Sequence, residues 1–171
     1  KTMDYSEWEK EVPRNQGGFA LEGDGDRLAL FLAEMGWFDA TKLMQDRRTI
    51  SLSDQLYRAL GSISANISEG YSRGTGKDRA RFYEYALGSS REARGWYLNG
   101  RHVLGEAVVQ HRIQLCAEII KLLLTMIPQQ RGYAVHENAA TYGDPSKNKQ
   151  PDTDSEARLF NEYLTHIPMP D

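Results

Sequence analysis

The 171-residue sequence contains one cysteine and no long hydrophobic run. A single cysteine cannot form an internal disulfide, so Cys116 favours a reducing compartment and we expect a cytoplasmic protein. Its spacing predicts a small buried side chain rather than a reactive thiol. A membrane-spanning helix needs about 20 apolar residues, whereas the longest aliphatic run here is 122–124, so we expect no membrane contact. We also expect no secretory leader.

Histidine is scarce, and its spacing excludes the best-known metal site of helical bundles. Di-iron bundles need two Glu-x-x-His motifs on facing helices, and none of the four histidines has Glu three residues before it. The glycine-rich run 74–77 resembles the end of a phosphate loop, but Asp78 follows it where Ser or Thr is required. We therefore expect no metal, no cofactor and no enzymatic activity.

Charge is distributed unevenly along the chain. Residues 50–133 carry 11 Lys and Arg against 7 Asp and Glu, a net +4, whereas residues 1–49 and 134–171 are net −3 and −4. A basic centre can bind a polyanion, although +4 is small for a nucleic-acid module. The acidic ends could instead fold back onto the centre, and we favour this self-neutralisation.

Apolar residues recur at three- and four-residue steps, which predicts four consecutive helices over about 26–43, 51–70, 75–105 and 106–127. Capping boxes at 51–54 and 75–78 predict the starts of the second and third helices. Gly70 is predicted to end the second helix and Pro128 the fourth. The apolar face expected for the third helix consists of Phe82, Tyr85, Ala86, Ser89, Ala93, Trp96, Tyr97, Gly100, Val103 and Leu104.

Four amphipathic helices joined by short loops predict an all-α fold, an antiparallel up-and-down four-helix bundle with N- and C-terminal extensions. We divide the chain into an N-terminal extension (1–24), the bundle (25–133), and a linker with a short C-terminal docking helix (134–171). The fourth helix is apolar around more than half its girth, which indicates either oligomerisation or a covering tail.

Both extensions carry apolar residues that could dock on the bundle. The N-terminal extension offers Tyr5, Trp8 and Val12. In the C-terminal extension, apolar residues at helical spacing predict a short helix, capped by Asp154 or Ser155. These apolar residues are Leu159, Phe160, Tyr163, Leu164 and Ile167.

A ladder of polar residues follows one side of the second helix. Its members, separated by three or four residues, are Gln55, Arg58, Ser62, Asn66, Glu69 and Arg73. A solvated face would carry Lys and Glu, whereas this ladder has Ser and Asn beside aliphatic residues. We interpret it as a hydrogen-bonded seam between helices or subunits, in which the arginines pair with Glu69 or Glu92. The alternative is a groove that binds RNA or a peptide.

The third helix carries a second polar set, which could follow the phosphates of a nucleic acid. It comprises Lys77, Arg79, Arg81, Arg91, Arg94 and Arg101. Because no aromatic residue lies between these cations on that side, stacking on single strands is disfavoured. A solvated face paired with Glu84 and the acidic ends is the interpretation we favour.

The ladder also carries a family resemblance. The runs 54–59 and 62–70, then Arg73, with Phe82, 86–89 and 91–92 on the third helix, resemble the four-helix-bundle proteins named for the 23S ribosomal RNA intervening sequence. The resemblance covers about residues 50–127. It implies a four-helix bundle that forms closed rings, notably pentamers, with no established enzymatic activity. Similar bundles are nucleic-acid-binding accessory subunits of reverse transcriptases in retroelements.

Two functions follow as hypotheses. The first is a non-enzymatic, homo-oligomeric bundle, expected to be a pentamer, that acts as an assembly or adaptor module and contacts protein partners through its extensions. The alternative is an accessory factor that binds RNA or DNA, for example one that serves a reverse transcriptase or ribosomal RNA. The two long extensions and the net negative charge depart from the family pattern.

Overall fold

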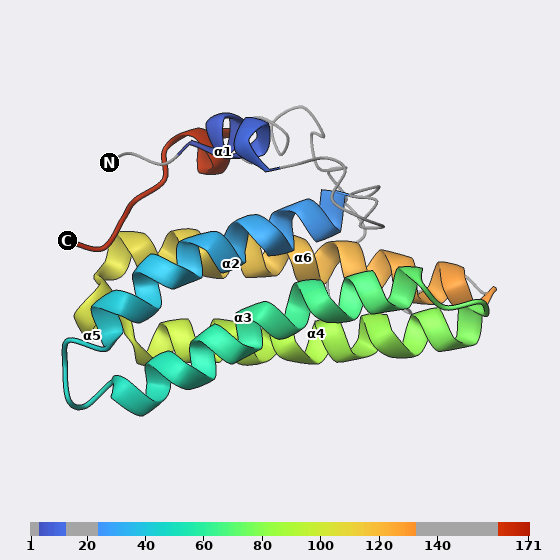
Figure 1. The fold of residues 1–171 in the computed structure, drawn as a ribbon, viewed down its shortest axis with the longest axis horizontal. Coiled ribbons are helices and arrows are strands. Elements are labelled where there is room, and N and C mark those ends of the chain that lie inside the picture. The colour runs from blue at the N-terminus through green and yellow to red at the C-terminus, as the bar shows by residue number, and fades with distance from the viewer. Residues whose placement is uncertain (1–3, 13–23, 133–160) are drawn as a thin grey trace, which may run out of the picture.

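The computed structural model describes residues 4–12, 24–132 and 161–171, and every regular element among them is a helix. A further helix without a label in Figure 1 spans 161–165. The labelled helices are α1 (Tyr5–Glu11), α2 (Asp24–Leu43), α3 (Ile50–Tyr71), α4 (Gly76–Asn99), α5 (Arg101–Leu104) and α6 (Glu106–Arg131).

The four long helices form the predicted antiparallel up-and-down bundle, so the expected fold class is confirmed. Each long helix packs against two neighbours in the cyclic order α2, α3, α4, α6. The short α1 and the segment 161–171 lie together over α2 and α6, on one side of the bundle (Figure 1). This side of the bundle is therefore covered by both ends of the chain.

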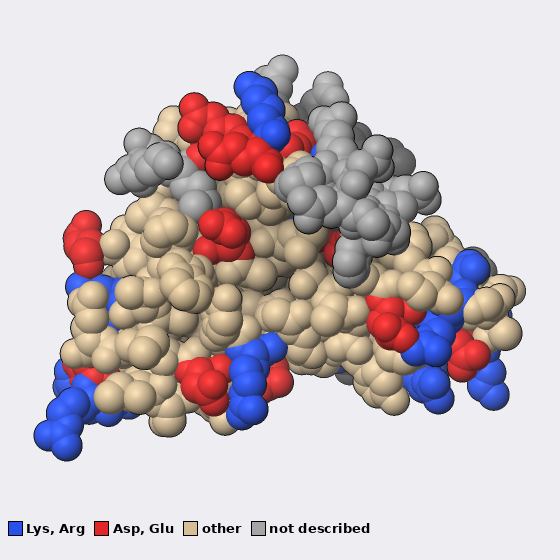
Figure 2. Space-filling model, viewed as in Figure 1, with Lys and Arg blue, Asp and Glu red and all other residues tan. Residues whose placement is uncertain are grey.

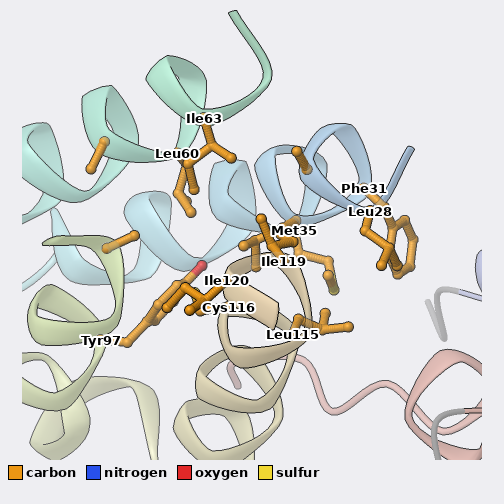
Figure 3. Packing of buried hydrophobic residues seen from close by; sticks show 14 of the residues in the cluster. Leu28, Phe31, Met35, Leu60, Ile63, Tyr97, Leu115, Cys116, Ile119 and Ile120 are labelled. Atoms are coloured by element: carbon orange, nitrogen blue, oxygen red, sulfur yellow. The ribbon is translucent and has the colours of Figure 1, made fainter. Parts of the chain in front are cut away.

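The core lies between the four helices and is built mainly from aliphatic side chains. Figure 3 shows Met35 of α2, Leu60 of α3, Tyr97 of α4 and Ile119 of α6 pointing into the space between the helices, with Leu28 beside Phe31 farther along α2. Cys116 is fully buried in the same cluster, as predicted, and burial raises the pKa of its thiol to about 12. The thiol is therefore protonated and unreactive at neutral pH.

Local sequence explains some helix boundaries better than others. Thr75 caps α4 as predicted, because its Oγ1 accepts a hydrogen bond from the Asp78 backbone N–H at 3.2 Å. The box at 51–54 does not cap α3, whose N-cap is Thr49. The Thr49 hydroxyl donates to the Leu43 carbonyl (2.6 Å) and so ties together the ends of α2 and α3.

Two predicted helix ends are wrong. Gly70 does not end α3 and has no positive φ. A Cβ there would lie 2.5 Å from Cε1 of the buried Tyr83, so glycine permits close approach of α3 and α4. Pro128 does not stop α6, which continues to Arg131 and ends at the left-handed Gly132 (φ 74°). Pro128 lacks the backbone N–H that would donate to the carbonyl four residues earlier, but α6 continues past it for three more residues.

The buried face of α4 is displaced around the helix axis from the predicted one. Tyr83 and Leu87 are buried, whereas Tyr85, which we placed on the apolar face, is 53% exposed. The predicted helix also breaks near Gly100, where α5 begins. The displacement follows from the neighbours of α4, because the helix must face both α3 and α6.

Both terminal segments dock on the bundle through apolar side chains. The rings of Tyr5 and Trp8 of α1 lie 4.9 and 5.0 Å from the ring of Phe31, measured between centroids, and Glu9 forms an ion pair with Arg27 (2.7 Å). At the other end, Ile167 is 4% exposed. A covering tail thus accounts for part of the excess apolar surface of α6. Residues 154, 155, 159 and 160 of the predicted C-terminal helix lie outside the described residues.

Candidate functional site

The predicted ladder lies at the seam between α3 and α4. Asn66 donates through Nδ2 to the backbone carbonyl and to Oγ of Ser62 (2.8 and 3.0 Å). Ser89 of α4 donates to the same Ser62 hydroxyl at 3.0 Å, which joins the two helices. Gln55, Ser62 and Asn66 are all half-buried. The centre of the ladder is therefore a short hydrogen-bonded chain that fixes the register of α3 against α4.

The charged members of the ladder pair with carboxylates or arginines four residues away in the chain. Arg73 forms an ion pair with Glu69, and its guanidinium lies 4.6 Å from the centre of the Phe82 ring. Arg58 is paired with Asp54 (3.4 Å) and not with Glu69 or Glu92. Both Arg58 and Asp54 are mostly exposed, so this pair contributes little to stability. The charged ends of the ladder are open to solvent, unlike its centre.

The cations of the second set differ in their environment. Arg79 is half-buried and donates through Nε to the Arg73 carbonyl (2.8 Å), which ties down the α3–α4 loop. Arg81 Nη2 lies 3.7 Å from Asp78 Oδ1. Glu84, also on α4, forms an ion pair with Arg131 of α6. Lys77 is exposed near the start of α4.

Arg91, Arg94 and Arg101 project to solvent on the outer side of α4 and α5. Among the described residues no carboxylate pairs with them, and Arg101 donates only to the Leu98 carbonyl (3.0 Å). The described parts of the two extensions dock elsewhere, on α2 and α6. Self-neutralisation by the described acidic residues therefore does not involve these three arginines.

Sequence reasoning missed an exposed apolar strip along α2 and α3. Trp37 lies on α2 and Met44 directly follows the end of that helix, whereas Ile50 and Tyr57 lie two turns apart on α3. Their exposed fractions are 59, 62, 50 and 43% respectively, and the rings of Trp37 and Tyr57 are 6.1 Å apart. Figure 2 shows that uncharged residues cover most of this side of the molecule. We call these four residues the α2–α3 strip.

Sequence reasoning also missed a buried polar network that joins three helices. Asp39 of α2 and Arg112 of α6 are both fully buried, and they form a two-pronged ion pair, with Arg112 Nε and Nη2 at 2.8 and 3.2 Å from the carboxylate oxygens. The Tyr97 hydroxyl of α4 donates to the same carboxylate at 2.9 Å. Burial, with the Asp39 charge, raises the pKa of Tyr97 well above its usual value. The tyrosine hydroxyl is therefore a permanent donor.

The network continues through His111 to the C-terminal segment. Arg112 Nη1 donates to His111 Nδ1 (2.8 Å), which places the ring proton on Nε2, and Nε2 donates to the Tyr163 carbonyl (2.6 Å). Arg112 Nη2 also donates to the Pro168 carbonyl (3.0 Å). Burial, and secondarily the Arg112 charge, lowers the pKa of His111 to about 4, so the ring is neutral at pH 7.

The sequence does contain a signal for this network. Asp39 occurs at the helical spacing of the core residues Leu32, Met35 and Leu43, and Arg112 interrupts the buried series Val108, Leu115 and Ile119. One acid and one base that each interrupt an apolar stripe predict a buried pair, because an isolated buried charge is too costly.

Two grooves lie beside the docked termini. One of about 540 Å³ is lined by residues of α1, α2, α6 and the C-terminal segment, including Leu122 and Leu164. Another, of about 470 Å³, has Trp8, Phe38 and Met169 as its apolar part. The second groove is also lined by the acidic residues Asp4, Glu7, Glu11, Glu34 and Asp171.

The described residues contain no group of three metal-binding side chains, and no described helix is long and apolar enough to span a membrane. In comparisons with known proteins, the family model described as 23S rRNA-intervening sequence protein matches residues 31–125, which is more than half of the chain. Neither the curated proteins nor the solved structures gave a match.

Proposed function

Because the chain belongs to the 23S rRNA-intervening sequence protein family, we propose that it is a non-enzymatic assembly module that associates with copies of itself in the cytoplasm. The observation that carries this proposal is the α2–α3 strip. Four large apolar side chains, each at least 43% exposed, lie on the α2–α3 side of the bundle, and the rings of Trp37 and Tyr57 are 6.1 Å apart between centroids. Contiguous apolar surface of this kind is typical of protein interfaces.

Composition supports the same use of the strip. Trp, Tyr and Met are enriched at the centres of interfaces, and Trp37, Tyr57 and Met44 supply one of each. The ion pair of Arg58 with Asp54 lies on the same helix as Tyr57 and offers a polar rim. Ring closure requires that a second, different surface of each copy receive the strip of the next copy. A pentamer is one such ring and remains part of the proposal.

Trp37→Glu tests this proposal against a matched control, Leu124→Glu. Leu124 is exposed to a similar extent (47%) but lies on α6, away from the strip. We expect Trp37→Glu to reduce the mass in solution toward that of a single 19.4 kDa chain, measured by light scattering after gel filtration, while Leu124→Glu keeps the wild-type mass. Equal masses for the two variants would contradict the strip as the interface.

A second candidate function is nucleic-acid binding along α4. The specific observation that favours it is the exposed row of Arg91, Arg94 and Arg101, for which no described carboxylate is a partner. We expect charge reversal of all three to weaken RNA or DNA binding and to reduce its dependence on salt concentration. As a control, charge reversal at Arg58, which is paired with Asp54, should leave the binding of RNA or DNA unchanged. Binding that is absent, or that salt does not weaken, would exclude this candidate.

A further inference from the structure

The C-terminal segment 161–171, here called the tail segment, is held by directed contacts as well as by apolar burial. The carbonyls of Tyr163 and Pro168 accept hydrogen bonds from two consecutive residues of α6, His111 Nε2 at 2.6 Å and Arg112 Nη2 at 3.0 Å. Ile167 lies between these two carbonyls in the sequence and is 4% exposed. The bundle therefore recognises backbone and side chain of the tail segment together.

The donors that hold the tail segment are fixed by the bundle itself. Asp39 holds the Arg112 guanidinium through two hydrogen bonds, and Tyr97 holds Asp39. Arg112 in turn sets the tautomer of His111, so that its Nε2–H points toward the tail segment. We call the surface formed by His111 and Arg112 and the adjoining residues of α1, α2 and α6 the tail slot. Pre-arranged donors and an apolar lining suit this slot to binding an extended peptide, because little ordering is left to occur on binding.

The connection between the bundle and the tail segment is long. The two are separated by residues 133–160, which is 28 residues and allows a reach of up to about 90 Å. Along α6, Arg131 and Arg112 are about 29 Å apart, and α4, the second longest of the described helices, is about 36 Å long. Both lengths are well below the reach of the connection. The chain is thus long enough to place its tail segment in the slot of an adjacent copy as well as in its own.

We propose that the tail slot binds the tail segment of a second copy of the chain, so that copies in an assembly exchange their tail segments. This proposal rests on the proposed self-association, because the tether of residues 133–160 gives the chain's own segment an effective concentration of the order of millimolar. In dilute solution the tail slot of each chain is therefore occupied by its own tail segment. In an assembly, the neighbour's segment is tethered at a comparable concentration, and exchange then adds the directed contacts of the slot to those of the strip.

Disulfide trapping between two full-length variants tests the exchange. One variant carries Met169→Cys in the tail segment and the other carries Phe38→Cys, since both residues line the same groove beside the slot. Neither variant alone can join its own tail segment to its own slot, because the remaining Cys116 is fully buried and its thiol pKa is about 12. A covalent heterodimer formed on mild oxidation therefore reports a tail segment in another chain's slot.

Two controls make the result decisive. Met169→Cys mixed with Leu98→Cys, an exposed position on α4, measures random collision, and a single chain with both Phe38→Cys and Met169→Cys shows that the thiols reach each other. We expect at least about tenfold more heterodimer from the Phe38→Cys mixture than from the Leu98→Cys mixture, and suppression by excess synthetic peptide of residues 161–171.

The outcomes separate this proposal from the proposed function when the mass of the wild-type chain is measured in parallel. An oligomeric mass with heterodimer only at the collision level contradicts exchange and leaves self-association standing. A monomeric mass without heterodimer contradicts both. Heterodimer from a chain of monomeric mass contradicts association through the strip, and with it the proposal that exchange takes place within an assembly. Failure of the double variant to oxidise contradicts docking of the tail segment, and exchange with it.

Discussion

Acidification should destabilise the folded chain through His111. The folded state keeps this ring neutral, with a pKa of about 4, whereas an unfolded chain has the ordinary histidine pKa of about 6.5. A proton therefore binds the unfolded state more readily, and the free energy of unfolding falls as the pH drops from about 6.5 toward 4. The structural cause is direct, because a protonated Nδ1 can no longer accept the hydrogen bond from Arg112.

The expected loss in the free energy of unfolding follows from the two pKa values. Between pH 7 and pH 5 the linkage amounts to about 2 kcal/mol for one such histidine. Carboxylates elsewhere also respond to pH, so the matched comparison is His111→Gln. Its amide can still donate to the Tyr163 carbonyl and accept from Arg112, but it does not titrate.

The assay is urea unfolding followed by tryptophan fluorescence, at pH 7 and pH 5 and at one fixed protein concentration. We expect the wild type to lose about 2 kcal/mol more than His111→Gln over this interval. The reasoning would be refuted if the two proteins lost the same free energy of unfolding, because His111 would then titrate alike in both states.

Three further predictions follow from buried positions in the bundle. Gly70→Ala should lower stability in thermal unfolding by about 1–3 kcal/mol, because the new Cβ would lie 2.5 Å from Cε1 of the buried Tyr83; an unchanged melting temperature would contradict this packing. Burial raises the pKa of Asp26 to about 6, so the ionised form is disfavoured in the folded state. Asp26→Asn should therefore stabilise the chain at pH 8 by up to about 3 kcal/mol. In denaturant titrations this gain in stability should vanish near pH 4. A gain that does not depend on pH would exclude this cause. Asn66→Leu should lower the melting temperature more than Lys77→Ala, because it removes a hydrogen-bond partner of the α3–α4 seam, and equal shifts would count against the seam.

The fold was predictable because it depends on periodic patterns. Apolar spacing located all four long helices, and the start of α4 followed from the local chemistry of Thr75. The apolar face of α4 was predicted with Tyr85 inside, whereas the structure buries Tyr83 instead. Periodicity finds the widest apolar stripe of a helix, but the packing of its neighbours decides which part of that stripe is buried.

The features that depend on tertiary contacts were not predictable from local rules. Gly70 has the composition of a helix end, yet its role is the approach of α3 to Tyr83. The ladder was found because it repeats along one helix. Asp39 and Arg112, by contrast, are 73 residues apart, and each is a single charge within its own apolar stripe. Only their joint burial reveals the pair and the tail slot that it supports.

The most direct test of the central claim is the mass of the wild-type chain in solution. The full-length sample is treated with nuclease, so that bound nucleic acid cannot hold copies together. Its mass is then measured by sedimentation equilibrium at about 10 µM and pH 7. We expect a single species whose mass is a multiple of 19.4 kDa and is unchanged by nuclease treatment. A mass of 19.4 kDa at this concentration would contradict self-association through the α2–α3 strip.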